Sequence, residues 1–230
     1  MKAYAIVIDG NEISELGYGR LAKSSWDVEN EFTLERFNAI IPSNVLDLME
    51  SDQIRWNYPW EGQVTDFQTG LIKTAYQTKD FRKRMACAMS HYCLWVKSFE
   101  TRENILVLEH DAEFTNKLDV DIEKTVFGIL GVNSPLGATR KSQLYHDVIQ
   151  RNSSLYQEVP YVDDIKIPQG LAGNSAYIIT SWAAKELIDK VREYGLWPND
   201  AIMCRQLFPF LGVTKKYYTK TQGLKSTTTL

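Results

Sequence analysis

Hydrophobic residues in this chain gather in short continuous runs that alternate with longer segments of helical periodicity. Five runs have the length and the polar or turn-forming boundaries of β-strands, at residues 3–8, 37–41, 104–108, 126–130 and 176–180. Residues 105–108 are all aliphatic, which is typical of a strand that is buried on both faces. The runs therefore predict several short strands in the interior of a sheet.

Two longer segments place their apolar residues on one helical face. In residues 78–100 the side chains that recur at this spacing are Met85, Met89, Tyr92, Trp95, Val96 and Phe99. A second such face follows Ser181, which we expect to cap the helix, and ends at Gly195. Strands that alternate with amphipathic helices indicate an α/β protein whose mostly parallel sheet is flanked by helices on both faces.

The composition limits what the protein can bind. Hydrophobic residues make up 44% and charged residues 24% of the 230, and a net charge of −3 disfavours non-specific nucleic-acid binding. No apolar run approaches the roughly 18 residues of a transmembrane helix, and the three cysteines form no metal-type pair. We expect one domain over residues 1–230, with a flexible tail at about 224–230. We expect the protein to lie in the cytoplasm, or peripherally at the membrane face.

Acidic side chains follow two of the predicted strands. Ligands of such sheets bind beyond the carboxyl ends of the strands, where Asp9, Glu109 and Asp111 lie. In an extended segment Glu109 and Asp111 point the same way and His110 points away, so the two carboxylates could hold Mg²⁺ or Mn²⁺ with a diphosphate. The alternative is a solvated polar loop.

Cationic residues open the long predicted helix. Arg82, Lys83 and Arg84 precede the pair Ser90 and His91. Cations at a helix N-terminus oppose the helix dipole, so an anionic ligand nearby would explain them. The alternatives are a solvated basic turn and a buried histidine that serves packing.

Asp200 lies in the segment Trp197-Pro-Asn-Asp-Ala-Ile, before a short apolar stretch. It could be an N-cap or an acid in the first turn of a helix, which base rates favour, or act as a general base at the mouth of a cleft. The chain lacks the phosphate-binding, dinucleotide-binding, serine-hydrolase and zinc-protease motifs. Those enzyme classes are therefore disfavoured.

Three motifs, taken in order, resemble those of a known enzyme family. They are Cys87-Ala-Met-Ser-His-Tyr-Cys-Leu-Trp95, Ile105-Leu-Val-Leu-Glu-His-Asp-Ala112 and Gly173-Asn-Ser-Ala-Tyr-Ile-Ile179. Their order and separations resemble glycosyltransferase family 25, which includes bacterial lipooligosaccharide galactosyltransferases and collagen galactosyltransferases. Arg36-Phe-Asn-Ala39 is similar to a further segment of that family, and Asp200 falls where the family has a late aspartate.

The resemblance implies a Rossmann-like GT-A fold, a nucleotide-sugar donor such as a UDP-hexose, a divalent metal (Mn²⁺ or Mg²⁺), and inversion at the anomeric carbon. The acceptor would be a saccharide, as in lipopolysaccharide or other surface glycan biosynthesis. Asp111 and Glu109 would hold the metal, and Asp200 and Asp111 would be the catalytic acids. The residues expected to bind the donor are Asp9, Ala39, Arg82, Lys83, Ser90, His91 and Glu109.

The chain also departs from the family pattern. The acidic triplet is Glu109-His110-Asp111 where the family has Glu-Asp-Asp, and Ala86 replaces the usual glycine. The loop after Asp9 lacks the family's Asn-Leu-Asp-Arg pattern, which leaves the identity of the donor open. Two other functions are kept as alternatives: a viral-type transferase that glycosylates hydroxylated DNA bases, and an inactive module that binds nucleotide sugars.

Overall fold

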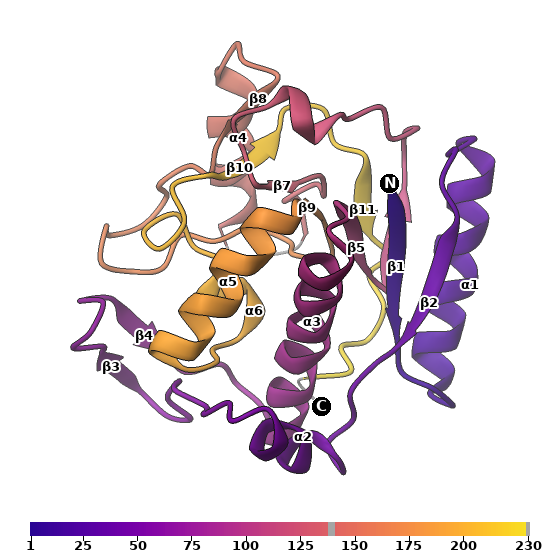
Figure 1. Ribbon diagram of the computed structural model, residues 1–230. Helices are drawn as coiled ribbons and strands as arrows, with labels where there is room; N and C mark the ends of the chain where they lie inside the picture. Colours follow the sequence, from indigo (N-terminus) through magenta and orange to yellow (C-terminus); the bar gives the residue numbers. More distant parts are fainter. Residues whose placement is uncertain (138–140, 229–230) are drawn as a thin grey trace.

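The computed structural model describes residues 1–137 and 141–228. Within them a seven-stranded sheet has the order β2-β1-β5-β9-β7-β10-β8 (Figure 1). In that order the strands are Leu34–Asn38, Lys2–Val7, Ile105–Glu109, Ala176–Ile179, Ile129–Gly131, Leu211–Thr214 and Tyr156–Glu158. Only β9 and β8 run antiparallel to their neighbours in this sheet. The predicted α/β architecture with a mostly parallel sheet is confirmed.

Helices cover both faces of this sheet. The helices are α1 (Glu12–Asp27), α2 (Val45–Ser51), α3 (Phe81–Thr101), α4 (Ser142–Arg151), α5 (Ser181–Tyr194) and α6 (Asn199–Ile202), with a 3₁₀ turn at Ile122–Lys124. α3 and α5 lie together on one face, and α1 lies on the other (Figure 1). Residues alternate along β1 in the same way, because Tyr4 and Ile6 join the core under α3, whereas Ala5 and Val7 join the core under α1.

Some element boundaries differ from the predicted ones. β2 ends at Asn38 rather than continuing to residue 41, since the Ile40 N–H donates to the Ser90 hydroxyl at 2.9 Å rather than to a neighbouring strand. Val126 lies outside β7 and is 84% exposed. α5 is capped by the Thr180 side chain, one residue before the expected cap Ser181. Each difference arises from a side chain that takes a backbone hydrogen bond or from exposure that periodicity does not reveal.

The direction of β9 decides which residues meet at the functional edge of the sheet. β9 pairs antiparallel with β5, with Leu108 opposite Ala176, and the Glu109 N–H donates to the Ser175 carbonyl at 2.8 Å. Residues that precede β9 therefore lie beside residues that follow β5. A rule based only on the carboxyl ends of strands does not find them.

The last described segment of the chain returns to the same edge. β11 (Thr219–Thr221) pairs with β6 (Ala112–Phe114), and the Gln222 N–H then donates to the Asp111 carbonyl at 2.8 Å. Further on, the Thr78 hydroxyl donates to the Thr228 carbonyl at 3.0 Å. The flexibility of residues 224–230 stays a prediction: residues 224–228 are described and line the cavity discussed below, and residues 229–230 lie outside the described residues.

A separate two-stranded sheet joins β3 (Gln63–Thr65) to β4 (Ile72–Thr74). It lies beside the end of α5 in Figure 1. No helix in the described part of the chain is both long and apolar enough to cross a membrane.

Candidate active site

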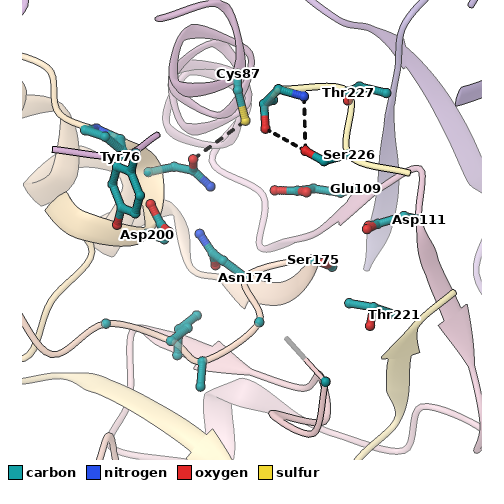
Figure 2. Close-up of a pocket in the computed structure, with 18 of the residues that line it drawn as sticks. Tyr76, Cys87, Glu109, Asp111, Asn174, Ser175, Asp200, Thr221, Ser226 and Thr227 are labelled. Atoms are coloured by element: carbon teal, nitrogen blue, oxygen red, sulfur yellow. Dashed lines mark hydrogen bonds between the residues drawn. The ribbon is translucent and has the colours of Figure 1, made fainter. Parts of the chain in front are cut away.

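A cavity of about 700 Å³ opens at the edge of the sheet where β5 ends. Its walls come from the end of β5, the segment before β9, α6, the first turns of α3 and the residues after β11. Figure 2 shows Glu109, Asp111 and Asp200 around this cavity. The sequence places these three acids up to 91 positions apart, and the fold brings them together.

Glu109 is held by a chain of buried hydrogen bonds. The Trp95 N–H donates to the Tyr177 hydroxyl at 2.8 Å, Tyr177 lies 2.9 Å from His91 Nδ1, and His91 Nε2 lies 3.2 Å from Glu109 Oε1. Since indole can only donate, the Tyr177 hydroxyl accepts from Trp95. An ionised carboxylate can only accept, so the bond between His91 Nε2 and Glu109 is one that His91 donates. His91 is therefore neither free nor a simple packing residue.

The electrostatic surroundings keep Glu109 ionised. Burial acts to raise its pKa, but the hydrogen bond from His91 and the electrostatic interactions with His91, His110 and Arg84 outweigh burial, so the pKa lies below its ordinary value. The His110 ring packs toward α1, where a Cβ on Gly17 would come within 3.1 Å of its Cδ2 atom.

Asp111 has the opposite behaviour. Burial and the neighbouring charge of Glu109 raise its pKa to about 7, against a hydrogen bond with Ser175 that lowers it. Its Oδ1 atom is buried and has no hydrogen-bond partner. A buried oxygen without a partner, beside an ionised carboxylate, is a donor set that suits a hard divalent cation such as Mg²⁺ or Mn²⁺.

A second possible cation group shares Glu109. The ligand atoms of Cys87, His91 and Glu109 lie within 4.8 Å of one another. However, both ring nitrogens of His91 are engaged in the hydrogen-bond chain. Burial also raises the pKa of the Cys87 thiol well above its ordinary value, and the thiol lies 3.7 Å from Asn199 Oδ1. These three groups therefore fit a metal ion less well than the Glu109 and Asp111 carboxylates do.

Asp200 lies in the first turn of α6 and does not cap it. The N-cap position is Pro198, with no side-chain capping bond, so the N-cap interpretation is wrong, whereas the alternative of an acid in the first turn of the helix is confirmed. Burial raises the pKa of Asp200, while the charge of Arg84 and a hydrogen bond from Tyr76 act to lower it. Figure 2 shows the Asp200 carboxylate beside the Tyr76 ring and facing the cavity. A buried carboxylate with a raised pKa in a cleft is suited to accept a proton.

A smaller cavity of about 230 Å³ adjoins the first one. Five of the predicted donor-binding residues line it: Ala39, Lys83, Ser90, His91 and Glu109. Much of its remaining wall is aliphatic, including Ile6, Ile8 and Ile40. The Ser90 hydroxyl accepts from Ile40 N and donates to the Ala86 carbonyl, so it shapes this wall through the backbone.

Two predicted residues lie elsewhere. Asp9 is exposed and pairs with Arg36 at 2.7 Å, and the Arg82 guanidinium pairs with Asp80 at 3.2 Å. In the described part of the chain, neither residue lines the larger or the smaller cavity. Their donor-binding role stays a prediction.

Sequence reasoning missed several residues that line the larger cavity. They are Tyr76, Cys87, Asn174, Ser175, Asn199 and Thr221. Cys87, Asn174 and Ser175 fall inside the three family motifs, and this was the one signal in the sequence that could have identified them. The motifs do not indicate which side chains point into the cavity. Arg84 also lines this cavity, with its guanidinium 5.1 Å from the centre of the Tyr76 ring.

Comparison with known proteins adds to this geometry. A comparison with curated protein sequences finds no significant match. Among solved structures, the galactosyltransferase LgtC in complex with donor and acceptor sugar analogues is 11% identical, with a TM-score of 0.44 over 93% of this chain and 73% of that one. The glycosyltransferase GlyE of Streptococcus pneumoniae TIGR4 is 14% identical, with a TM-score of 0.42 over 92% of this chain and 44% of that one.

The family comparison covers most of the chain. Residues 28–203 match the model of glycosyltransferase family 25 (LPS biosynthesis protein). This range includes the three motifs, Glu109, Asp111 and Asp200. The chain therefore belongs to glycosyltransferase family 25, and its activity is that of a glycosyltransferase.

Proposed function

We propose that this protein transfers a hexose from a UDP-sugar to a saccharide acceptor of a surface glycan, with inversion at the anomeric carbon and with a divalent metal. The observation that carries the proposal is the meeting of Asp200 with Glu109 and Asp111 in one cavity. An inverting transfer needs a base on one side of the sugar and charge stabilisation of the departing diphosphate on the other. In this proposal Asp200 is the base, and Glu109 and Asp111 lie on the side of the departing diphosphate.

Glu109 and Asp111 are the residues that would hold the metal. When bound, Mn²⁺ or Mg²⁺ supplies a positive charge that offsets the charge of the departing nucleoside diphosphate. The hydrogen bond from His91 orients Glu109 for this role. The unpartnered Oδ1 of Asp111 supports the same assignment.

Cationic side chains would add to the stabilisation of the diphosphate. Arg84 lies in the larger cavity, and its charge acts on both Glu109 and Asp200. Lys83 lies on the wall of the smaller cavity. The aliphatic wall beside it suits the nucleoside of the donor, so we place the nucleoside in this cavity.

Asp200 would act as the base. It takes the proton of the acceptor hydroxyl as that oxygen bonds to the anomeric carbon and the bond from that carbon to the diphosphate oxygen breaks. Burial raises its pKa, which strengthens it as a base, while Tyr76 and Arg84 keep the carboxylate form accessible. Tyr76 also orients the carboxylate through its hydroxyl.

The test is a thermal-shift panel of UDP, UDP-glucose, UDP-galactose and UDP-N-acetylglucosamine, each with and without Mn²⁺. Binding to the native state raises the melting temperature, so the donor should give the largest shift and should need the metal. Release of UDP is then measured with that donor and a set of oligosaccharide acceptors. A protein that binds the donor and releases no UDP with any acceptor would support the inactive module instead. Retention on DNA at low salt, with transfer to hydroxymethylated bases, would support the alternative acceptor.

A further inference from the structure

The side chain of Asn174 has an unusual place in the larger cavity. It is only 8% exposed, and both its Oδ1 and its Nδ2 atoms are buried without a hydrogen-bond partner. An amide can accept two hydrogen bonds and donate two, so the folded protein leaves the whole capacity of this group unused. Because a buried polar atom without a partner carries its full desolvation cost, a ligand that completes these bonds is the natural explanation.

The backbone around Asn174 is fixed on both sides. The Ser175 carbonyl accepts the Glu109 N–H at 2.8 Å, and Gly170 packs so closely on α6 that an added Cβ would lie 2.2 Å from the Asp200 carbonyl oxygen. Gly173 adopts a positive φ of 73°, which turns the chain just before Asn174. The amide is thus held in position by the fold rather than by hydrogen bonds of its own.

The position of the amide selects its ligand. Figure 2 shows Asn174 between Asp200 and Ser175, with its amide pointing toward Asp200; Glu109 lies above Ser175, and Asp111 lies farther to the right. If Asp200 is the base and the acidic pair holds the diphosphate end, the sugar ring of the donor occupies the space between them. This step rests on the proposed function.

We propose that Asn174 binds two neighbouring hydroxyl groups of the hexose of the donor. Its carbonyl oxygen accepts from one hydroxyl, and its NH₂ donates to the other. A pair of adjacent hydroxyls offers both a donor and an acceptor, and so matches the two unused atoms of one amide. Asn174 is therefore a residue that binds the transferred sugar and not the nucleotide.

The experiment compares Asn174→Ala and Asn174→Leu with the wild-type protein by calorimetry with Mn²⁺. The probes are UDP and the UDP-hexose that the panel identifies. Leucine has the same branching at Cγ as asparagine, with two methyl groups in place of the amide atoms, and it leaves no empty space, so it separates loss of the amide from creation of a space. We expect both variants to bind the UDP-hexose about tenfold more weakly and to bind UDP as the wild type does. Both variants should also melt no lower than the wild type, because they remove polar atoms that lack partners.

Asn133→Ala is the matched control. Asn133 is equally buried, but it accepts from Thr219 at 2.8 Å, donates to the Ser134 carbonyl at 2.9 Å and does not line the cavities. Its loss should lower the melting temperature and leave UDP-hexose affinity unchanged. Unchanged UDP-hexose affinity in both Asn174 variants, or an equal loss for UDP, would overturn the assignment of Asn174 while UDP binding upholds the proposed function. Failure of UDP and of every UDP-sugar to bind the wild type would instead overturn the proposed function.

Discussion

Two buried polar groups in this protein use their hydrogen-bonding atoms differently. Near the β3–β4 sheet, Asp66 pairs with Lys73 at 2.5 Å and accepts the Gln68 and Thr69 N–H groups, while Lys73 also donates to the Asn57 carbonyl. In the candidate active site, by contrast, Asp111 Oδ1 and both amide atoms of Asn174 have no partner. The first group is complete without a ligand. The second has the form expected of a site that a ligand completes.

The comparison also concerns charge. The Asp66 and Lys73 side chains are 4% and 3% exposed, and the opposite charges face each other directly, with the Lys73 ammonium 4.5 Å from the centre of the Trp197 ring. At the active site, burial and the negative charge of Glu109 together raise the pKa of Asp111. Like charges brought together in a cavity cost stability in the free protein and prepare it for a cation.

The largest expected effect on activity is that of substituting Asp111, which belongs to the group without hydrogen-bond partners. Asp111→Ala should lower UDP release by about a thousandfold or more, because the metal and the diphosphate lose their main contact. Its melting temperature should stay the same or rise, since a buried oxygen without a partner is removed. Glu113→Ala is the control, because Glu113 lies two residues later and pairs with Lys220. Wild-type turnover by Asp111→Ala in metal-free buffer would contradict the metal assignment.

The second effect concerns stability and is expected at the other group. Lys73→Met leaves Asp66 buried without its cation and should destabilise the protein by about 3–5 kcal/mol. Chemical denaturation measures this, with Lys185→Met as control, because the exposed Lys185–Asp189 pair should contribute little. Donor affinity should remain unchanged in both variants. Weaker donor binding by folded Lys73→Met would contradict this prediction. It would show that the Asp66–Lys73 pair also serves the active site.

Acid should affect this structural group in a defined direction. Burial acts to raise the pKa of Asp66, but the hydrogen bond from Lys73 and those from the backbone outweigh it, so the folded pKa lies below 3.8. The pair therefore contributes its full stability above the ordinary carboxyl pKa and loses it as the pH falls through the folded value. Unfolding curves between pH 6 and pH 3 should show a smaller loss in Lys73→Met than in the wild type.

A third prediction separates the base from the binding residues. Asp200→Asn should lower kcat by roughly a hundredfold while UDP-hexose affinity holds, because the amide cannot accept the proton. Steady-state kinetics and calorimetry on the same preparation measure the two quantities. Asp164→Asn serves as control, since Asp164 lies in an exposed loop. A near-normal rate for Asp200→Asn would leave the base of the reaction unidentified.

The smallest effect is expected in the hydrogen-bond chain behind Glu109. Tyr177→Phe removes the hydroxyl that is hydrogen-bonded to His91 Nδ1 and so removes the contact that holds the His91 ring behind Glu109. We expect donor affinity in the presence of Mn²⁺ to fall by about tenfold and kcat to change little. Tyr92→Phe is the control, because Tyr92 is a buried tyrosine on the same side of α3 as Trp95. Equal donor affinity of the two variants would show that the hydrogen bonds through Tyr177 and His91 do not position Glu109.

The sequence predicted α3, α5 and five strands of the main sheet because their signal is local, but it did not predict α1, β8 or β10. The aliphatic run at 105–108 and the helical face around Met89 and Trp95 are set by burial alone, and both appear in the structure. Glu109 and Asp111 could be predicted because they follow such a run directly. The metal and donor roles of these residues remain proposals.

The rest of the site depends on contacts between distant segments. The antiparallel direction of β9, which places Asn174 beside Glu109, cannot be inferred from the residues of either strand. Asp200 was expected to cap a helix because a cap is the commoner use of an aspartate before an apolar turn, and only its tertiary contact with Tyr76 reveals its other surroundings. Asp9 follows β1 as the acids follow β5, but Arg36 holds it outside the cavity.

The pairing of β6 with β11 has a consequence for the order in which the site assembles. Thr221 lies opposite Ala112, and the Gln222 side chain donates to the carbonyls of His110 and Ala112, about 110 residues earlier in the chain. Contacts between such distant residues form late, because the loop they close must first be ordered. On the ribosome, the turn that carries Asp111 therefore waits for residues 219–222 before it can take its final shape. We therefore expect the acidic turn to reach its final form only after residues 219–222 have been synthesised, although its strand is among the most buried.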